Sequence, residues 1–348
     1  MLNSRIQKLL SLMENEGIDT AIITDPKNMH YYSGFYNGEG YVVISSEKSY
    51  VVTDFRYTEY AQDVCKGFEV CDISKHKPSD FTGKGRVGFE DRSISYGEYK
   101  KFSEYISDFV PLGNIALLPR EIKDSTEIAN IKKAVDIADG AFSHICKYMK
   151  KGMSEKEVAA EIDCYMKKNG AEGNSFSTIV AAGERGSLPH AHPSDRKLES
   201  GDLVVMDYGC VVGGYCSDMT RTVAVGDISD ECANVYDKVL FAQKEALAVL
   251  KAGLSGKVVD AVARGILDMA YPGAFGHSLG HSVGLDIHEN PNLSPKNENP
   301  VCAGNVITVE PGVYLPGKCG VRIEDLTLVT ENGCEIFTNS PKNLIFVG

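Results

Sequence analysis

The chain has 348 residues, which is long enough for about two domains rather than one ordinary core. Hydrophobic residues make up 43% and charged residues 24%, a balance that is typical of globular proteins and argues against disorder. Acidic residues outnumber basic ones by 48 to 36, which gives a formal net charge of −12. Because such a surface repels phosphate backbones, we expect no nucleic-acid partner.

The sequence shows no sign of a membrane or secretory segment. No apolar run reaches the roughly 18 residues that a membrane helix needs, and the first residues lack the charged-then-apolar layout of a signal peptide. The ten cysteines contain no CxxC pair and no zinc-ribbon spacing. A chain of this size has enough core to fold without disulfides. We therefore expect no membrane partner and a reduced, cytoplasmic protein.

The first third of the chain predicts a mixed α/β unit. Apolar residues recur at helical spacing over residues 1–17, which predicts an amphipathic helix. Short β-branched or aromatic runs and periodic segments predict further strands (21–24, 41–45, 50–54, 87–89) and helices (56–63, 96–109). A turn-rich break from Pro111 to Pro119 follows. We place the domain boundary there, giving an N-terminal domain over 1–121 and a second domain over 122–348.

The second domain begins with helices and continues with short strands. Apolar residues keep the helical period after Asp124, and Ser154 with Glu157 has the spacing of a capping box. Two further helices are predicted over 235–250 and 258–269. From Gly276 onward, short strands and glycine or proline turns dominate.

A hairpin over residues 203–222 brings two acids together. Two β-branched runs flank Gly213-Gly214, the signal of a two-residue turn. In that register Asp207 faces Thr220, and Asp218 lies diagonally across from Asp207 on the same face. Gly209 faces Asp218 and leaves space there for an ion. The hairpin alone is compatible with a metal site, an acid/base pair or two solvated acids.

Two more acids follow apolar strands later in the chain. Glu310 ends the strand in NVITVEPGVY, and Glu324 lies inside the apolar strand of GVRIEDLTLVT. A carboxylate inside such a strand is costly to bury unless it is paired or coordinated. The alternative is a wet face that exposes Arg322 and Glu324 together, but Leu326 and Leu328 continue the same parity, which favours an apolar face.

Histidines are concentrated near these acids. Five of the eight histidines fall between residues 190 and 288, in SLPHAHPSD and GHSLGHSVGLDIHE (His190, His192, His277, His281, His288). A site that combines these groups is rich in oxygen ligands with a minority of imidazole. Such a set suits Mn²⁺, or Co²⁺ and Zn²⁺, better than a cysteine-type zinc site. Four carboxylates suffice for two divalent ions, which predicts metal-assisted amide hydrolysis by a bridging hydroxide.

The order of these motifs resembles the pita-bread metallopeptidases, and within them the Xaa-Pro peptidases, that is, aminopeptidase P and prolidase. The resemblance spans LPHAHPSDRKLESGDLVVMDYG, GYCSDMTRT, GHSLGHSVGLDIHE, ITVEPGVY and GVRIED. It implies an α+β fold, in which a smaller mixed α/β creatinase/prolidase-type N-terminal domain precedes a pita-bread catalytic domain. It also implies a homodimer and a small peptide substrate with proline at the second position.

The resemblance also implies a role for each matched ligand position. Asp207 would chelate one metal, Asp218 and Glu324 would bridge both metals, and His281 with Glu310 would complete the ligand set of the other metal. Glu310 would also handle the proton of the nucleophile.

The remaining matched positions are implied to serve substrate. His190 and His288 would stabilise the tetrahedral intermediate and the scissile amide. His277 matches a histidine near the proline pocket, Arg322 a residue that supports Glu324 beside the bound substrate, and His192 a residue at the pocket rim.

The reaction implied by the resemblance is removal of an N-terminal residue when proline follows. The alternatives on the same fold are a methionine aminopeptidase, a creatinase-like enzyme and a catalytically silent binding module. The N-terminal domain disfavours the first, and the five ligand-competent positions disfavour the other two. The motifs do not separate aminopeptidase P from prolidase.

Overall fold

The computed structural model describes residues 4–348. Its contacts divide the chain into two compact units, with the division between Arg120 and Glu121. The predicted N-terminal helix is present from Ser4 (α1, Ser4–Asn15), and residues 1–3 of that prediction lie outside the described part. Among the described residues, no helix is both long and apolar enough to cross a membrane.

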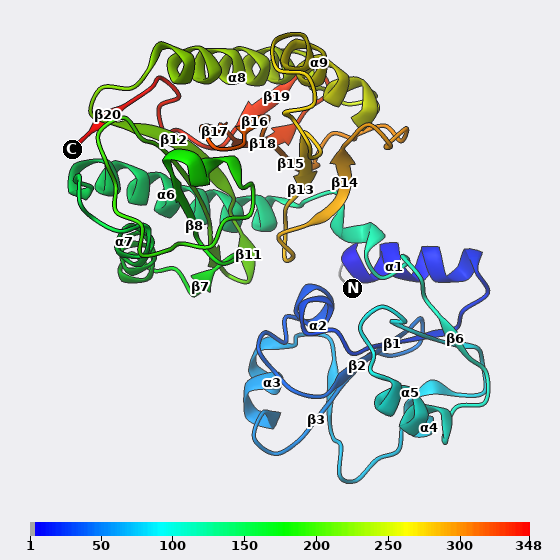
Figure 1. The fold of residues 1–348 in the computed structure, drawn as a ribbon. Coiled ribbons are helices and arrows are strands. Elements are labelled where there is room, and N and C mark those ends of the chain that lie inside the picture. The colour runs from blue at the N-terminus through cyan, green and yellow to red at the C-terminus, as the bar shows by residue number, and fades with distance from the viewer. Residues whose placement is uncertain (1–3) are drawn as a thin grey trace. The chain divides into compact units, whose positions relative to one another are not determined.

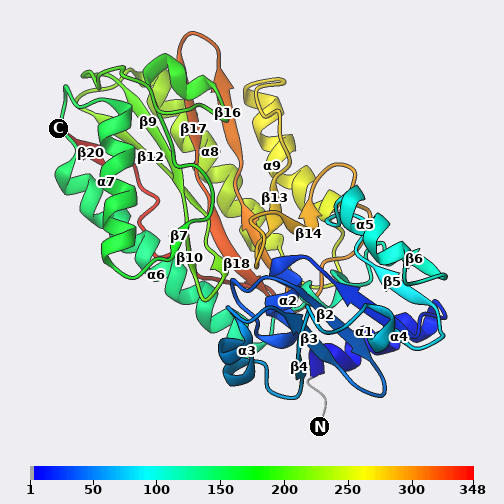
Figure 2. The same cartoon turned by 90° about the horizontal axis from the view of Figure 1, so that it is seen from below.

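The N-terminal unit is built on a six-stranded sheet with the order β4-β3-β2-β1-β5-β6 (Figure 2). The central strand β1 pairs antiparallel with β2 and parallel with β5. The strands are β1 (Thr20–Ile23), β2 (Tyr41–Ser45), β3 (Tyr50–Thr53), β4 (Glu69–Asp72), β5 (Val87–Phe89) and β6 (Phe109–Pro111). The remaining helices are α2 (Pro26–Ser33), α3 (Thr58–Val64), α4 (Ser79–Thr82), α5 (Tyr96–Ser103) and the 3-10 turn Leu118–Arg120.

One helix prediction in this unit is wrong in its extent. The helix predicted over 96–109 ends at Ser103, and Phe109 instead begins β6, which pairs in parallel with β5. Phe109 packs against Phe89 with ring centroids 4.4 Å apart. This long-range pairing overrides the helical periodicity, which is a local property.

The second unit combines four long helices with four sheets. The helices are α6 (Ser125–Tyr148), α7 (Glu155–Lys168), α8 (Asp230–Val249) and α9 (Gly256–Ala270), with a 3-10 turn at Gly183–Ser187. The sheet orders are β11-β10-β7, β20-β12-β9-β8, β14-β13-β15-β18-β19 and β16-β17. The strands are β7 (Gly173–Asn174), β8 (Ile179–Ala182), β9 (Leu203–Tyr208), β10 (Cys210–Val212), β11 (Tyr215–Cys216), β12 (Met219–Val225), β13 (Gly280–Ser282), β14 (Glu289–Leu293), β15 (Val306–Val309), β16 (Gly312–Leu315), β17 (Cys319–Arg322), β18 (Asp325–Val329), β19 (Cys334–Ile336) and β20 (Phe346–Val347).

Helix starts in this unit follow the capping signals in the sequence. Ser154 caps α7, and its reciprocal hydrogen bonds with Glu157 confirm the predicted capping box. Asp124 and Glu127 form the same arrangement at α6. Helix α8 begins at Asp230, five residues before the predicted start, because Ser229 caps it.

The helices of the second unit cover its strands from two sides (Figure 1). Apolar residues of α6 and α7 pack against β8, β9 and β12 in one core. Apolar residues of α8 and α9 pack against β15, β16 and β17 in the other. The strands therefore lie in a layer with apolar cover on both sides, where a charged side chain needs a partner.

A buried ion pair ties the segment ahead of α6 to the β13–β14 hairpin. Lys123 Nζ lies 2.9 Å from Glu289 Oε2, and the two side chains are 0% and 8% exposed. Glu289 also accepts a hydrogen bond from the backbone N–H of Asp286. Removing one partner of such a pair leaves an uncompensated buried charge.

We expect Lys123→Met to lower the free energy of unfolding by about 3–5 kcal/mol, because it removes the cation of a buried ion pair. The double variant Lys123→Met/Glu289→Met removes both charges and should recover most of that loss. Urea unfolding followed by circular dichroism measures the effect.

Lys257→Met is the matched control, because Lys257 pairs with Glu298 on the surface and its loss should cost at most about 1 kcal/mol. Equal losses for Lys123→Met and Lys257→Met would show that the buried pair contributes no more than an exposed one.

Candidate metal centre

The first hairpin adopts the register that its sequence predicts. Asp207 pairs with Thr220 along β9 and β12, and Val212 pairs with Tyr215 next to the turn. Both turn glycines have positive φ, the conformation that a two-residue turn requires. The prediction that Asp207 and Asp218 come from one hairpin is confirmed.

The expectation that Gly209 leaves room for an ion is wrong. A Cβ at Gly209 would lie 1.9 Å from the Ser217 carbonyl oxygen, so backbone already fills that space. Glycine is needed there because the facing strand approaches too closely for any side chain. The ladder is interrupted at this point, and Asp218 lies between β11 and β12.

A second hairpin is interrupted in the same way. Glu310 lies between β15 and β16, and Glu324 lies between β17 and β18. The prediction of Glu324 inside a continuous strand is therefore wrong. Its backbone N–H leaves the ladder and donates to the Thr220 carbonyl in the first hairpin, at 3.1 Å. The alternative of a wet face is also excluded, since Arg322 and Glu324 are both buried.

The two hairpins and His281 bring their ligand atoms together. Ligand atoms of Asp218, His281 and Glu324 all lie within 4.8 Å of one another. Nε2 of His281 is 3.5 Å from Asp218 Oδ2 and 3.3 Å from Glu310 Oε1. Asp207 reaches the same group electrostatically, because its charge raises the pKa of Asp218, Glu310 and Glu324.

His281 presents a free ring nitrogen to the carboxylates. Its Nδ1 lies 3.2 Å from the Ser282 carbonyl oxygen, which can only accept, so Nδ1 carries the proton. Burial, and then the positive charge that His288 can carry, lowers the pKa of His281 to about 4. The ring is therefore neutral at pH 7, with the Nε2 lone pair directed at the acids, as a metal ligand requires.

The carboxylates repel one another in this buried site. Burial, and then the charges of neighbouring carboxylates, raises the pKa of Asp218 and Glu324 well above the usual range. Burial also raises the pKa of Glu310 to about 8, against the opposing charge of Arg322. A bound cation would remove this repulsion.

Two buried oxygens support a cation-binding role. Asp207 Oδ1 and Glu324 Oε1 have no hydrogen-bond partner within the described residues, although their carboxylates are otherwise held in place. Unpartnered buried acceptors are rare and need an explanation such as a bound ion. With the free Nε2 of His281, these donors fit divalent cations that prefer oxygen with some imidazole.

Arg322 connects three groups around the site. It donates from Nη2 to Asp207 Oδ2 at 2.5 Å, from Nε to Thr220 Oγ1 at 3.0 Å and from Nη1 to the Tyr314 hydroxyl at 2.8 Å. Thr220 in turn donates to Glu324 Oε2 at 2.8 Å. The guanidinium thus orients Asp207 directly and Glu324 through one hydroxyl.

His277 is connected to Asp207 by a hydrogen-bond chain through Tyr314 and Arg322. Its Nδ1 donates to the Ser278 carbonyl, so its Nε2 accepts from the Tyr314 hydroxyl at 2.9 Å. Burial, and then the charge of Arg322, lowers the pKa of His277 to about 4, which keeps the ring neutral. The Phe275 ring contacts His277 edge-on.

The other three predicted histidines are exposed. The His288 ring lies 4.3 Å from the His281 ring. Burial, and then the charge that His190 can carry, lowers the pKa of His288. His192 is placed differently. Its backbone carbonyl accepts from Arg185, and its imidazole forms no hydrogen bond with the acids within residues 4–348.

Several contributors were not identified from the sequence. Thr220, Tyr314 and Thr308 each bond a site residue. Thr220 shares a strand face with Asp218, so strand alternation could have placed it near the site. Tyr314 lies four residues after Glu310, and alternation gave no indication of its contact with His277.

Comparison with protein families matches residues 129–331 to "Metallopeptidase family M24". That range is more than half of the chain, and it contains the four acids and the one histidine discussed as ligands. The chain belongs to metallopeptidase family M24. Residues 5–122 match "Creatinase/Prolidase N-terminal domain". The predicted α+β architecture, with this N-terminal domain ahead of a pita-bread catalytic domain, is confirmed.

Similar proteins match over nearly their whole length. The "Uncharacterized peptidase YqhT" of Bacillus subtilis is 45% identical and covers 99% of this chain and 100% of its own. The solved "Xaa-Pro dipeptidase" of Bacillus anthracis has a TM-score of 0.96 at 40% identity, with 99% of each chain covered. The solved "X-Pro aminopeptidase" of Thermotoga maritima has a TM-score of 0.92 at 37% identity, covering 99% of this chain and 100% of its own.

We expect metal uptake at pH 7 to release protons, because burial raises the pKa of Asp218, Glu310 and Glu324 in the metal-free protein. For the same reason, the metal-free protein should become less stable as pH rises from about 4.5 to about 8, since the folded state holds these protons more tightly than the unfolded chain. Calorimetric titration with Mn²⁺ in buffers of different ionisation enthalpy counts the protons.

Glu298→Gln is the control for this titration, because Glu298 is an exposed acid paired with Lys257. It should leave the proton count unchanged, whereas Glu310→Gln should reduce it. A binding heat that does not depend on the buffer would contradict the raised pKa values.

Proposed function

We propose that this metallopeptidase is a dinuclear exopeptidase that hydrolyses the bond between an N-terminal residue and a following proline. The observation that carries the proposal is the convergence of ligand-competent side chains from two interrupted hairpins and β13 in one buried site. Relatives named Xaa-Pro dipeptidase and X-Pro aminopeptidase share the whole chain length, which supports the specificity.

We assign two divalent ions to five ligands. Asp207 would chelate one ion, His281 and Glu310 would hold the other, and Asp218 and Glu324 would bridge them. The central position of Asp218 and Glu324, within 4.8 Å of His281, supports their bridging role. We propose Mn²⁺ as the working metal, because the set is dominated by hard oxygen ligands.

When bound, the ions would supply an activated water for attack on the amide and would stabilise the charge that develops on its carbonyl oxygen. We assign to Glu310 the role of accepting the proton from the attacking water. Its side chain is 16% exposed, against 13% for Asp207 and 7% for Asp218, so it is the most accessible of these three carboxylates. A proton-transfer group needs that access to the reacting atoms.

We assign substrate contacts to the histidines around the acids. His288 and His190 are exposed, and the His288 ring lies next to the His281 ring. We propose that both donate hydrogen bonds to the reacting carbonyl. We place His277, with Phe275 and Tyr314, at the pocket for the proline ring. Proline suits a rigid slot because its φ is fixed and its amide lacks N–H. Arg322 would support this pocket through Tyr314, and His192 would lie at its rim.

We further propose that the protein is cytoplasmic and works as a homodimer. All ten cysteines are present as thiols, as is usual in a reducing compartment. The dimer rests on the family resemblance, and light scattering of the purified protein tests it.

We expect turnover of an Xaa-Pro dipeptide or an Xaa-Pro-Yaa tripeptide, and none of the matched peptides that carry alanine in place of proline. Assays with Mn²⁺, Co²⁺ and Zn²⁺ each added to metal-free protein measure both specificities. Cleavage of the dipeptide alone identifies a prolidase, and cleavage of the tripeptide identifies an aminopeptidase P. Equal rates for proline and alanine peptides would sink the proposed specificity.

We expect Asp218→Ala and His288→Ala to separate metal binding from substrate binding. Asp218→Ala should abolish both metal uptake and hydrolysis, because a bridging carboxylate is lost. His288→Ala should lower kcat by about 10²–10⁴-fold while metal content stays normal. Metal analysis and kinetics measure the two effects, with the exposed His76→Ala as control. A metal-free His288→Ala would show that His288 is not a substrate contact.

A further inference from the structure

Glu324 is held by the first hairpin rather than by a strand ladder. It lies in the break between β17 and β18. Its N–H donates to the Thr220 carbonyl, its carbonyl accepts from Arg221, and its Oε2 accepts from the Thr220 hydroxyl. Only Oε1 is left without a partner. The hydrogen bonds to the other polar atoms of Glu324 therefore determine the direction in which Oε1 points.

Arg221 makes the contact to the Glu324 carbonyl from the interior of the protein. The residue is 1% exposed and lies on β12, next to Thr220. Its Nη1 also donates to the Thr220 carbonyl, and its Nη2 donates to Asp325 Oδ1 at 2.8 Å. The Arg221 guanidinium thus donates hydrogen bonds to Thr220, to the proposed bridging ligand Glu324 and to Asp325.

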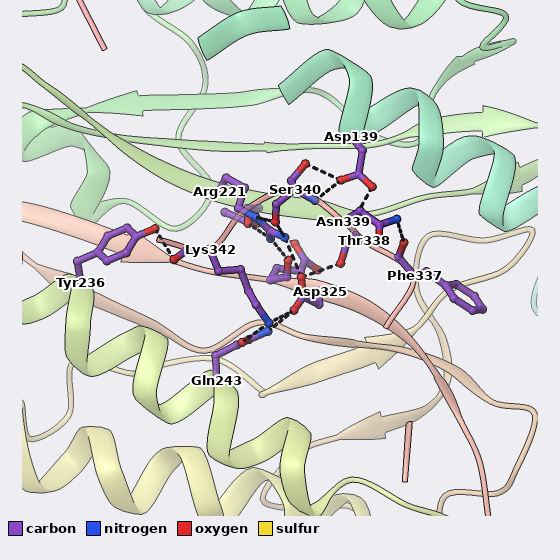
Figure 3. A network of polar contacts seen from close by, with 12 residues as sticks. Asp139, Arg221, Tyr236, Gln243, Asp325, Phe337, Thr338, Asn339, Ser340 and Lys342 are labelled. Atoms are coloured by element: carbon purple, nitrogen blue, oxygen red, sulfur yellow. Dashed lines mark hydrogen bonds and ion pairs between the residues drawn. The ribbon is translucent and has the colours of Figure 1, made fainter. Parts of the chain in front are cut away.

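Asp325 is fixed in turn by groups from distant parts of the chain (Figure 3). Its Oδ1 also accepts from Thr338, and its Oδ2 accepts from Gln243 on α8 and from Lys342. Every donor to this carboxylate except Arg221 therefore comes from α8 or from the segment near the C-terminus. The position of Arg221 therefore depends on the hydrogen bonds that hold Asp325.

The segment 338–342 is itself anchored on both helical layers. The Ser340 carbonyl accepts from Arg221, while Ser340 and Asn339 donate backbone N–H groups to Asp139 on α6. The Tyr236 hydroxyl on α8 donates to the Lys342 carbonyl. This segment lies beyond residue 331, where the match to the M24 family ends.

We propose that Arg221, braced by Asp325 and Lys342, is the positioning residue that sets the metal-binding geometry of Glu324. The proposal rests on Glu324 being a metal ligand, as assigned above. Groups that orient metal ligands without touching the metal typically contribute about 10–100-fold in metal affinity. The C-terminal segment is therefore part of the metal site, although none of its atoms is a ligand.

The test measures Mn²⁺ affinity of folded, metal-free protein by calorimetry, and stability separately by thermal unfolding. Arg221→Lys keeps the charge but loses the fork that spans Glu324 and Asp325, and we expect at least about 10-fold weaker Mn²⁺ binding. Arg196→Lys is the matched control, because Arg196 forms a forked pair with Asp202 outside the site. It should keep Mn²⁺ affinity within about twofold.

A second variant covers the case in which Arg221→Lys does not fold. Lys342→Met removes one donor to Asp325 from a partly exposed side chain. We expect Lys342→Met to weaken Mn²⁺ binding about 3–10-fold. Lys342→Arg, which keeps a donor to Asp325, should retain the affinity of the unmodified protein. Lys244→Met, an exposed position on α8 next to Gln243, should have no effect.

Unchanged Mn²⁺ affinity in Arg221→Lys and Lys342→Met, together with lowered unfolding temperatures, would overturn the positioning role and leave a purely structural one. Asp218→Ala separates this failure from failure of the proposed function. If Asp218→Ala also keeps its Mn²⁺ affinity, the metal site itself is wrongly assigned, and the positioning role falls with it.

Discussion

The repulsion among Asp207, Asp218, Glu310 and Glu324 is the constraint to which the rest of the second unit responds. These carboxylates face one another in a layer that helices cover on both sides, where water screens their charges only weakly. Burial and mutual repulsion raise the pKa values of three of them. A site of this kind is stable with its acids ionised only when cations neutralise it, which is why the arrangement suits a metallopeptidase.

The backbone meets this constraint by interrupting its strands at three of the four acids, whereas Asp207 stays within β9. Asp218, Glu310 and Glu324 all lie between named strands rather than within them. A continuous strand would alternate its side chains between the two covered faces. A break frees each acid from that alternation and lets it turn toward the shared site, while hydrogen bonds across the hairpins replace the lost ladder contacts.

Two arginines of similar burial serve the site in different ways. Arg322 bonds the side chain of Asp207 and the hydroxyls of Thr220 and Tyr314, so it acts on the orientation of side chains. Arg221 bonds the backbone of Thr220 and Glu324, and its charge is balanced by Asp325. Arg322 therefore acts on the orientation of the ligand side chains, whereas Arg221 acts on the position of the backbone that carries Glu324.

The sequence by itself determined the features that depend on residues near one another in the chain. Strand alternation and the Gly213-Gly214 turn were enough for the pairing of Asp207 with Thr220, and capping residues were enough for the start of α7. The motif order was enough for the family. Tertiary structure alone decided that Gly209 accommodates backbone, that Phe109 leaves its predicted helix for β6, and that Glu324 sits in a break. It alone also linked Arg221 to Glu324, Asp325 and Ser340, which are 103, 104 and 119 residues away. Local patterns carry no information about such contacts, because chain folding rather than spacing brings the partners together.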